Sequence, residues 1–344
     1  MDGTNILSID GSVLEGGGAI LRVASALSAV TKTPCHIFNI RGGRKKPGLM
    51  PQHLLGVQAL AQLCNGRLEG DFLGSEEIKF WPGEIKARDL HIKIETAGSI
   101  TLCLQSLLPV ALFASAPIKI IFDGGATDTF FSPTIDHFRF VFLEILKKMG
   151  AKVEIEILKR GFYPEGTAKV IVKIYPSKLK SLNLTERGDF KKILIISGAS
   201  ESLKNKKVAE RQIFGVKEIL GKLKLPIEEK IEYYDTQSPG SQICLVCEFG
   251  NTIIGTDNLG KLGKRAEDVG KEVALELLKE QKSGACLDKH LADQILPYMA
   301  LAPGKSQVTV SEITNHCKTN IWTIEKFIEG KFVIKENLIS WIPK

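Results

Sequence analysis

The sequence predicts an α/β protein of three β-α-β-α-β units packed together, with a small α/β unit inserted between the second and the third. One observation is that strand, helix, strand, helix and strand patterns occur three times in this order, at similar spacing. Another is that residues 184–281 differ in composition and carry strand and helix patterns of their own. The alternative is a chance alternation of elements, which any α/β chain can show.

The first unit contains the stretch Asp10–Arg22, in which three glycines follow Glu15 and lead into apolar residues at helical spacing. Glycines there allow a close approach to the backbone and direct free N–H groups toward an anion. A basic loop, Arg41–Gly48, precedes the second helix. The expected elements are strand 6–9, helix 19–30, strand 35–40 and helix 51–63, followed by further strands.

The second and third units repeat this order with different loops. In the second unit we expect strand 90–94, helix 100–113, strand 118–122, helix 135–149 and strands 152–158 and 169–174. In the third we expect helix 287–300, strand 308–310 and helix 319–328, with a loop at 311–318 before the last helix. Packing of the three units predicts sheets inside and helices outside.

The inserted unit predicts a separate domain. Its expected elements are strand 193–196, a lysine-rich turn at 204–207, helix 208–222, strands near 231–234 and 243–249, and helix 265–280. We therefore predict two domains, one formed by residues 1–183 and 282–344 and one by residues 184–281. The lysine-rich turn is interpreted as a solvated charge cluster, with a nucleic-acid contact as the alternative.

Composition and charge exclude several classes of protein. A hydrophobic fraction of 44% and a charged fraction of 25% are typical of soluble globular proteins, and no apolar run is long enough to span a membrane. No signal peptide is visible, so we expect a cytoplasmic protein without a membrane partner. The dispersed cysteines do not predict disulfides, and Cys244 and Cys247 are interpreted as buried residues of a strand. The net charge of +7 favours an anionic partner such as a nucleotide or nucleic acid.

Charged residues follow corresponding elements of the three units, so a shared geometry would bring them to one cleft. The loops before the second helices carry Arg41 and Arg44, then Asp128–Pro133, then His316. The starts of the first helices carry Glu15 and Arg22, and then Asp293 and Gln294. Arginines bind phosphates through paired hydrogen bonds, and a carboxylate can hold a divalent cation that neutralises them. This combination predicts phosphate chemistry.

The histidines lack the close spacing of a metal site. His36 and His91 lie in strand patterns and are interpreted as structural, whereas His137, at a helix start, is expected to be exposed. His53 follows the basic loop and either faces the same cleft or packs elsewhere. His316 is flanked by polar residues that can orient an imidazole, and a satisfied loop histidine is the alternative to a catalytic one. The sequence contains neither a Walker-type phosphate loop nor a nucleophile elbow.

Several short blocks along the chain occur in a distinctive order. The first reads Leu14-Glu15-Gly-Gly-Gly18-x-x-Leu21-Arg22, and the second Ile40-Arg41-x-x-Arg44-x-x-Pro47-Gly48-Leu49-x-x-Gln52-His53. The others are Ala97-Gly98-Ser99, Arg160-Gly161-Phe162-Tyr163-Pro164, Glu186-Arg187-Gly188, Leu291-Ala-Asp293-Gln294 and His316-x-x-Thr319-Asn320. Together these blocks resemble the RNA 3′-terminal phosphate cyclase family over essentially the whole chain.

The resemblance implies three β-α-β-α-β-β repeats with a small α/β domain inserted before the third. It also implies ATP-dependent conversion of an RNA 3′-phosphate into a 2′,3′-cyclic phosphate, through AMP bound covalently to His316 and then to the RNA end. In such a site Glu15 would hold Mg²⁺ or Mn²⁺, and Arg22, Arg41, Arg44 and Gln52 would contact phosphates, with His53 beside them. Asp293 and Gln294 would place the nucleotide and His316, and the adenine would stack between His290 and Pro133.

Two departures from the family pattern concern the nucleotide site and a nearby loop. Members often have tyrosine where this chain has His290, although an imidazole can still stack on adenine. A family glycine cluster is replaced here by Glu165–Ala168.

The main alternative function is that of a non-catalytic relative that binds RNA or protein in ribosome assembly. A further alternative is an enolpyruvyl transferase on a similar repeated fold. The sequence leaves open the RNA substrate, the choice between RNA and DNA ends, the metal and the oligomeric state, a homodimer included.

Overall fold

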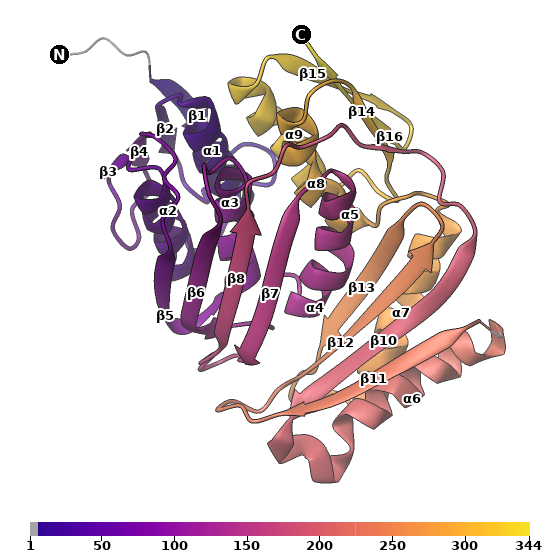
Figure 1. Ribbon diagram of the computed structural model, residues 1–344. Coiled ribbons are helices and arrows are strands. Elements are labelled where there is room, and N and C mark those ends of the chain that lie inside the picture. The colour runs from indigo at the N-terminus through magenta and orange to yellow at the C-terminus, as the bar shows by residue number, and fades with distance from the viewer. Residues whose placement is uncertain (1–5, 224) are drawn as a thin grey trace.

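The computed structural model describes residues 6–223 and 225–344. Within these residues the strands form four four-stranded sheets, and three of the sheets share one topology (Figure 1). In each of the three, the first two strands are parallel, and the fourth strand lies antiparallel between the second and the third. This confirms the predicted α/β fold, with three β-α-β-α-β-β repeats and an inserted α/β unit.

The first two repeats follow the predicted order of elements. The first contains β1 (Leu7–Asp10), α1 (Gly18–Thr31), β2 (Cys35–Phe38), α2 (Pro51–Leu63), β3 (Arg67–Glu69) and β4 (Ile78–Trp81). The second contains β5 (Leu90–Ser99), α3 (Ile100–Ala111), β6 (Ile118–Ala126), α4 (Ile135–His137), η1 (Phe138–Phe142), α5 (Leu143–Lys148), β7 (Lys152–Lys159) and β8 (Lys169–Tyr175). The helix predicted at 135–149 thus contains a π-helical turn, η1, between two α-helical segments.

The third repeat takes its first strand from before the inserted unit. It contains β9 (Asn183–Leu184), α8 (Lys289–Leu301), β14 (Ser306–Thr309), α9 (Asn315–Phe327), β15 (Gly330–Lys335) and β16 (Leu338–Pro343). Because β9 pairs in parallel with β14, the insertion lies inside this repeat and not before it. The loop predicted at 311–318 is also wrong, because the Thr314 hydroxyl accepts a hydrogen bond from Cys317 N at 3.2 Å and caps α9 there.

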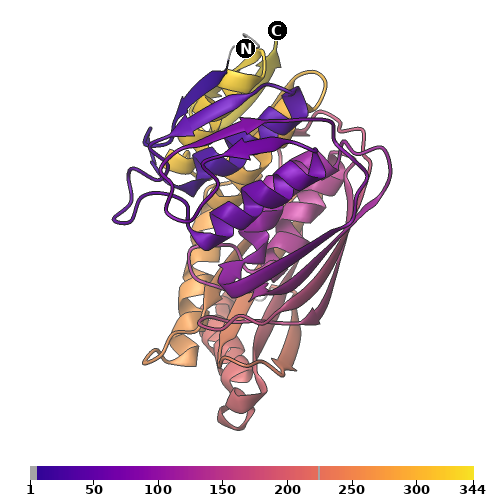
Figure 2. The same cartoon turned by 90° about the vertical axis from the view of Figure 1, so that its left-hand side faces the viewer.

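The helices of the three repeats meet one another, and the sheets face outward (Figures 1 and 2). α1 packs against α3 and α9, α2 packs against α3, and α8 packs against α9. Burial alternates along β5 and β7, whereas nearly every residue of α3 is buried. One sheet face is therefore exposed to solvent, and α3 is a core helix. The expected arrangement, with sheets inside and helices outside, is wrong.

The inserted unit has a different sheet order, β11-β10-β12-β13. Its elements are β10 (Phe190–Ser200), η2 (Glu201–Lys206), α6 (Val208–Leu220), η3 (Gly221–Leu223), β11 (Ile227–Tyr234), β12 (Ser241–Phe249), β13 (Ile253–Leu259) and α7 (Ala266–Lys282). α6 and α7 pack together over the sheet around a hydrophobic cluster of their own, and α4 and η1 contact the sheet strands β12 and β13. The domain division at residues 184–281 stays a prediction.

Candidate active site

The turn between β1 and α1 brings two side chains to the start of α1. A Cβ atom on Gly17 would collide with the carboxylate of Glu15, and one on Gly18 would collide with the imidazole of His53. A larger residue at either position would have to push these side chains aside. The glycine stretch holds Glu15 and His53 close against the backbone at the helix N-terminus.

Glu15 connects the first repeat to the third. Its side chain is buried, yet neither carboxylate oxygen accepts a hydrogen bond from the described residues. Arg44 forms an ion pair with it, and His316 Nε2 lies 3.8 Å from its Oε1 atom. The Glu15 N–H donates to Thr319 Oγ1 at 3.2 Å. The basic loop of the first repeat and the start of α9 therefore meet at one carboxylate.

His316 is arranged to keep its imidazole neutral. Partial burial and the positive charges of Arg22 and Arg44 lower the pKa of His316 below its ordinary value. The side chain is nevertheless 46% exposed, so it can be reached from solvent. A neutral and accessible imidazole nitrogen is a competent nucleophile near pH 7.

Arg22 and Asp293 lie close enough to influence each other's charge, and the charge of Arg22 also acts on His316. Burial lowers the pKa of Arg22 to about 10, and the charge of Asp293 opposes this shift. Burial raises the pKa of Asp293 to about 7, although the charge of Arg22 acts in the other direction. The Asp293 carbonyl accepts a hydrogen bond from Asn320 Nδ2 at 2.8 Å, which ties α8 to α9.

A narrow pocket opens between the central helices next to this pair. Its polar lining residues are Arg22, Gln105, Asp293, Gln294, Tyr298 and Asn320. Gln294 Oε1, Tyr298 OH and Asn320 Oδ1 have no hydrogen-bond partner among the described residues. Unpaired buried polar atoms are rare and point to water or a ligand. The sequence reasoning missed Gln105 and Tyr298, although a glutamine within the apolar helix α3 is a detectable signal.

Arg41 and Gln52 hold the basic loop and the neighbouring repeat in place. Arg41 Nη1 donates to the carbonyls of Lys46 at 2.7 Å and Gly48 at 3.1 Å, within its own loop. Gln52 Oε1 accepts from Ser99 N at 3.5 Å, which connects α2 to the second repeat. Both side chains are half-buried. Arg41 thus already has backbone partners that a phosphate would have to share.

His53 is the buried member of the predicted site. Burial lowers the pKa of His53 to about 3, and the charges of Arg22 and Arg41 act in the same direction. The imidazole is therefore neutral, and its Nδ1 atom has no hydrogen-bond partner among the described residues. Of the two alternatives left by the sequence, the structure places His53 against Gly18 beside the Glu15 turn.

Pro133 and His290 both lie beside β13. The Pro133 carbonyl accepts from Thr101 Oγ1 at 2.9 Å, and the following residue, Thr134, donates its N–H to Asp257 Oδ2 at 2.6 Å. His290 is exposed in the first turn of α8, whose cap Asp288 accepts from Gly255 N at 3.1 Å. Stacking of adenine between Pro133 and His290 stays a prediction.

Two predictions, one about His137 and one about the cysteines of β12, can be compared with the structure. His137 is buried, with 1% of its surface exposed, so its expected exposure is wrong. Its helix start is covered by β12 and β13 of the inserted unit, which the sequence does not indicate. Cys244 and Cys247 are buried in β12, as predicted.

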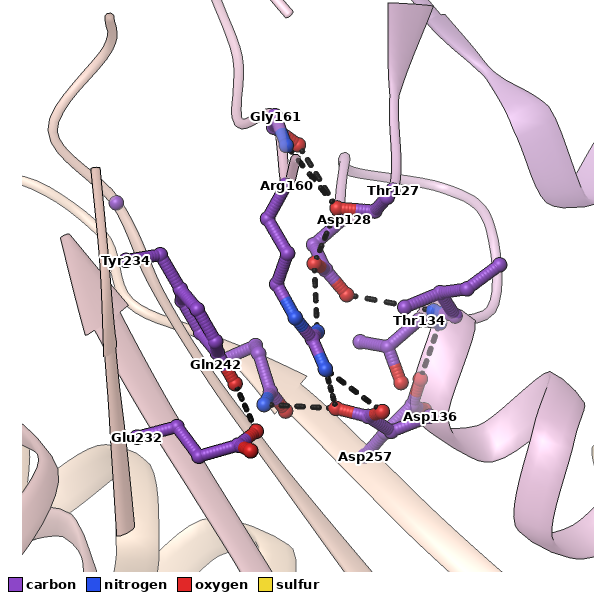
Figure 3. A network of polar contacts seen from close by, with 12 residues as sticks. Thr127, Asp128, Thr134, Asp136, Arg160, Gly161, Glu232, Tyr234, Gln242 and Asp257 are labelled. Carbon is purple, nitrogen blue, oxygen red and sulfur yellow. Dashed lines mark hydrogen bonds and ion pairs between the residues drawn. The ribbon is translucent and has the colours of Figure 1, made fainter. Parts of the chain in front are cut away.

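A second charged cluster lies where the second repeat contacts the inserted sheet (Figure 3). Arg160 Nη2 donates to both oxygens of Asp136 at 2.7 and 2.6 Å, and Nη1 donates to Asp128 Oδ2 at 3.1 Å. Gln242 donates to Asp136 at 2.9 Å from β12, and the guanidinium lies 4.6 Å from the ring centroid of Tyr234. All these charges are buried and paired within the protein.

Glu15 is the residue that fits a divalent cation. Among the residues that the structure describes, no three His, Cys, Asp or Glu side chains are grouped to hold a metal. Mg²⁺ commonly takes one or two carboxylates and completes its shell with waters and substrate phosphates. The two buried oxygens of Glu15, which accept no hydrogen bond, suit such a shared site.

The fold and the site define a repeated α/β protein with a candidate anion-binding centre of arginines, one buried carboxylate and a neutral histidine. A family model described as RNA 3′-terminal phosphate cyclase matches residues 13–334. The chain belongs to the RNA 3′-terminal phosphate cyclase family. This confirms the resemblance, and with it the prediction that the chain is an enzyme of this family, a ligase.

Similar proteins include several archaeal RNA 3′-terminal phosphate cyclases. That of Pyrococcus furiosus is 44% identical over 331 residues, which is 96% of this chain and 95% of the relative. That of Methanothermobacter thermautotrophicus is 42% identical and covers 96% of each chain. A solved structure, the enolpyruvyl transferase NikO from Streptomyces tendae, has a TM-score of 0.22 at 8% identity, over 98% of this chain and 81% of that chain. This likeness is too low for a structural argument.

Within the described part of the chain, no helix is both long and apolar enough to cross a membrane.

Proposed function

We propose that this protein converts an RNA 3′-terminal phosphate into a 2′,3′-cyclic phosphate, using ATP and a covalent AMP on His316. The observation that carries the proposal is the meeting of Glu15, Arg44 and His316, with Nε2 of the histidine 3.8 Å from the carboxylate. These residues come from the first and third repeats. A surface histidine without a catalytic role has no need of this arrangement.

The first step is nucleophilic attack by His316 on the α-phosphorus of ATP. The lowered pKa of His316 leaves a lone pair on the ring nitrogen near pH 7. A bond forms between this nitrogen and phosphorus, the bond from phosphorus to the bridging oxygen breaks, and pyrophosphate leaves. Arg22 and Arg44 lie close enough to influence the charge of His316, and they would stabilise the phosphates.

The second and third steps transfer AMP and then release it. An oxygen of the RNA 3′-phosphate attacks the histidine-bound phosphorus, and the bond to His316 breaks, which regenerates the imidazole. The neighbouring ribose 2′-hydroxyl then attacks the RNA phosphorus and loses its proton, and AMP leaves as the ring closes. The hydroxyl needs no further positioning because it is held next to the phosphate by the ribose.

The remaining site residues would position the nucleotide. Unpaired polar atoms of Gln294, Tyr298 and Asn320 line the narrow pocket beside Asp293, where they would hydrogen-bond to an edge of the nucleotide or to water. Arg41, Gln52 and His53 would border the phosphates, and His290 and Pro133 would stack on the adenine. Mg²⁺ or Mn²⁺ held by Glu15 would neutralise phosphate charge when bound.

The test is incubation of the protein with ATP, Mg²⁺ and an RNA oligonucleotide that ends in a 3′-phosphate. We expect an end that resists phosphatase, as a cyclic phosphate does, and no change to an oligonucleotide that ends in a 3′-hydroxyl. The variant His316→Ala should lose this activity. His91→Ala removes a histidine that is 65% exposed on β5 and serves as the matched control.

One result would contradict the proposal and favour the non-catalytic alternative. In that result the wild-type protein binds the RNA but does not cyclise its end when ATP and Mg²⁺ or Mn²⁺ are present. Equal activity of the wild type and His316→Ala would instead keep cyclisation and exclude His316 as the nucleophile.

A further inference from the structure

Three exposed aromatic side chains gather at the tips of two neighbouring loops. Phe130 is 42% exposed, Phe131 is 102% exposed and Tyr163 is 59% exposed. The rings of Phe130 and Tyr163 meet edge to face, with their centroids 6.3 Å apart. A single exposed aromatic residue needs no explanation, but a group of three presents an apolar surface that suits a ligand.

The two loops form a rigid frame beneath these rings. Thr127 N and Asp128 N both donate to the Gly161 carbonyl, at 3.0 and 3.3 Å. The buried ion pair of Arg160 with Asp128 joins the same loops (Figure 3). The backbone of Phe131 has a φ of +64°, in a region that non-glycine residues rarely occupy. The loops therefore fix the backbone from which the rings project before a ligand binds, which lowers the entropy cost of binding.

Hydrogen bonds connect this frame to the candidate active site. The Pro133 carbonyl, next to the exposed phenylalanines, accepts from Thr101 Oγ1, which lies 2.9 Å from Ser99 Oγ. Ser99 N in turn donates to Gln52 Oε1. Gln52 is adjacent to His53, which packs on Gly18 beside Glu15. A chain of hydrogen bonds thus links the backbone beneath the aromatic group to the α2 residues next to the candidate active site.

Positive charge lies at the same end of the inserted unit. Glu165 N donates to Ser238 Oγ at 3.0 Å, so the Tyr163 loop touches the turn before β12. At the adjoining end of β13, Gly260 N donates to the Ser241 carbonyl at 2.8 Å. The loop that follows carries the exposed cations Lys261 and Arg265, of which Arg265 lies 3.6 Å from Glu267. Aromatic rings beside cations suit a single-stranded nucleic acid better than an apolar peptide.

We propose that Phe130, Phe131 and Tyr163 stack against unpaired bases at the 3′ end of the substrate RNA. This inference rests on the proposed function, because it takes RNA as the polymer that enters the site. Every base has a π-face, so such stacking tolerates any sequence. The inferred substrate is therefore an RNA whose last bases are unpaired, because bases within a duplex already stack on each other.

Direct binding tests this inference separately from catalysis. The probe is a fluorescently labelled single-stranded RNA with a 3′-phosphate, and the readout is its anisotropy without ATP. The double variant Phe130→Ala with Phe131→Ala should bind roughly 5- to 150-fold more weakly, the range expected for one lost stacked base. Phe214→Ala, which removes a phenylalanine 59% exposed on α6, is the matched control and should bind as the wild type does.

Abasic RNA distinguishes stacking from a general loss of structure. Removing the last bases should weaken binding by the wild type by a similar factor and have little further effect on the double variant. A variant with Phe130→Ala and Phe131→Trp regains one aromatic ring. It should bind RNA that retains its last bases more tightly than abasic RNA, as the wild type does. Equal preference in the wild type and the double variant would overturn the inference.

The AMP labelling of His316 by ATP needs no RNA and should stay unchanged in the double variant. If the wild type is not labelled at all, the proposed function is overturned. If it is labelled but binds abasic RNA as tightly as RNA with bases, only the stacking inference is overturned. If the aromatic group instead joins two copies of this chain, the double variant will change the mass in solution but not the affinity for RNA, which also overturns the inference.

Discussion

The two charged clusters of this protein use the same residue types in opposite ways. Around Arg160, all four carboxylate oxygens of Asp128 and Asp136 accept hydrogen bonds from within the protein. At Glu15, both oxygens are buried but accept none, although Arg44 lies beside them. We call the Arg160 cluster closed because its carboxylate oxygens all have partners, and the Glu15 cluster open because its carboxylate oxygens accept no hydrogen bond.

The difference shows how structural and functional charges can be separated by physical criteria. A buried charge that is paired and hydrogen-bonded holds two parts of a protein together, and removing one partner is costly. A buried carboxylate without hydrogen bonds has a cost that a ligand can offset when it binds. We therefore interpret the Arg160 cluster as a structural contact with the inserted unit, and we propose that the Glu15 cluster is the reactive centre.

Breaking the closed cluster should have the largest effect. Arg160→Met leaves two buried carboxylates without their cation, and we expect the free energy of unfolding to fall by about 3–5 kcal/mol, measured by urea denaturation. The control Arg88→Met removes an exposed arginine and should change the free energy of unfolding by less than about 0.5 kcal/mol. Adding Asp128→Asn and Asp136→Asn to Arg160→Met should recover part of the loss. An Arg160→Met protein as stable as the wild type would contradict the comparison.

Removing the open carboxylate should impair activity and spare stability. Glu15→Ala should slow the formation of the histidine–AMP by about 10²–10³-fold, the range for loss of one electrostatic contact to a reacting phosphate. The free energy of unfolding should not decrease, because Glu15 has no hydrogen bonds to lose and the Arg44 side chain is 48% exposed. Rates and urea curves from the same preparations check both statements. Destabilisation as large as that of Arg160→Met would make Glu15 structural.

Asp293 should make stability depend on pH. Its pKa in the folded protein is about 7, well above that of an unfolded aspartate, so the folded state binds the proton more tightly. The resulting stabilisation is full at about pH 4 and is lost as the pH rises through about 7. Asp293→Asn cannot lose this proton, so its unfolding free energy should improve relative to the wild type between pH 5 and pH 8. A constant difference across that range would contradict the assignment.

The smallest predicted effect concerns the lowest pH at which AMP is still transferred to His316 at the full rate, which we call the acid limit. Because the pKa of His316 is lowered, the wild-type rate should hold as the pH falls to about 6.5 and decline only below it. Arg44→Met removes a positive charge near the imidazole, favours its protonated form and should move this limit to higher pH. Lys45→Met is the neighbouring control. A downward shift in Arg44→Met would contradict the predicted electrostatics.

Much of the fold could be predicted from local patterns, and the errors have physical reasons. α2 begins at Pro51 and ends at Leu63, as expected, because proline and the apolar spacing mark it. β9 is only Asn183–Leu184, too short to show a period, so the start of the third repeat was missed. The sequence does carry a signal for the observed order of layers, because the strand 152–159 alternates polar and apolar residues whereas α3 is mostly apolar and nearly all buried.

The site shows a similar division between sequence and structure. Arg44 and His316 could be selected because they lie in equivalent loops of two repeats, and Glu15 because it precedes a glycine-rich helix start. The structure brings the three together. The hydroxyl cap at Thr314 that sets His316 into α9 was overlooked in the sequence. Residues such as Tyr298 lie in an apolar helix, and only the packing of α8 against its neighbours shows that the hydroxyl faces the pocket.

The central claim is that the open cluster carries a nucleophilic histidine. The most direct measurement incubates the protein with α-labelled ATP and Mg²⁺, without RNA, and maps the labelled peptide. We expect one label on His316, lost in acid and kept in alkali, as a phosphoramidate behaves, and absent from His316→Ala. A label on another residue, or full labelling of His316→Ala, would contradict the account.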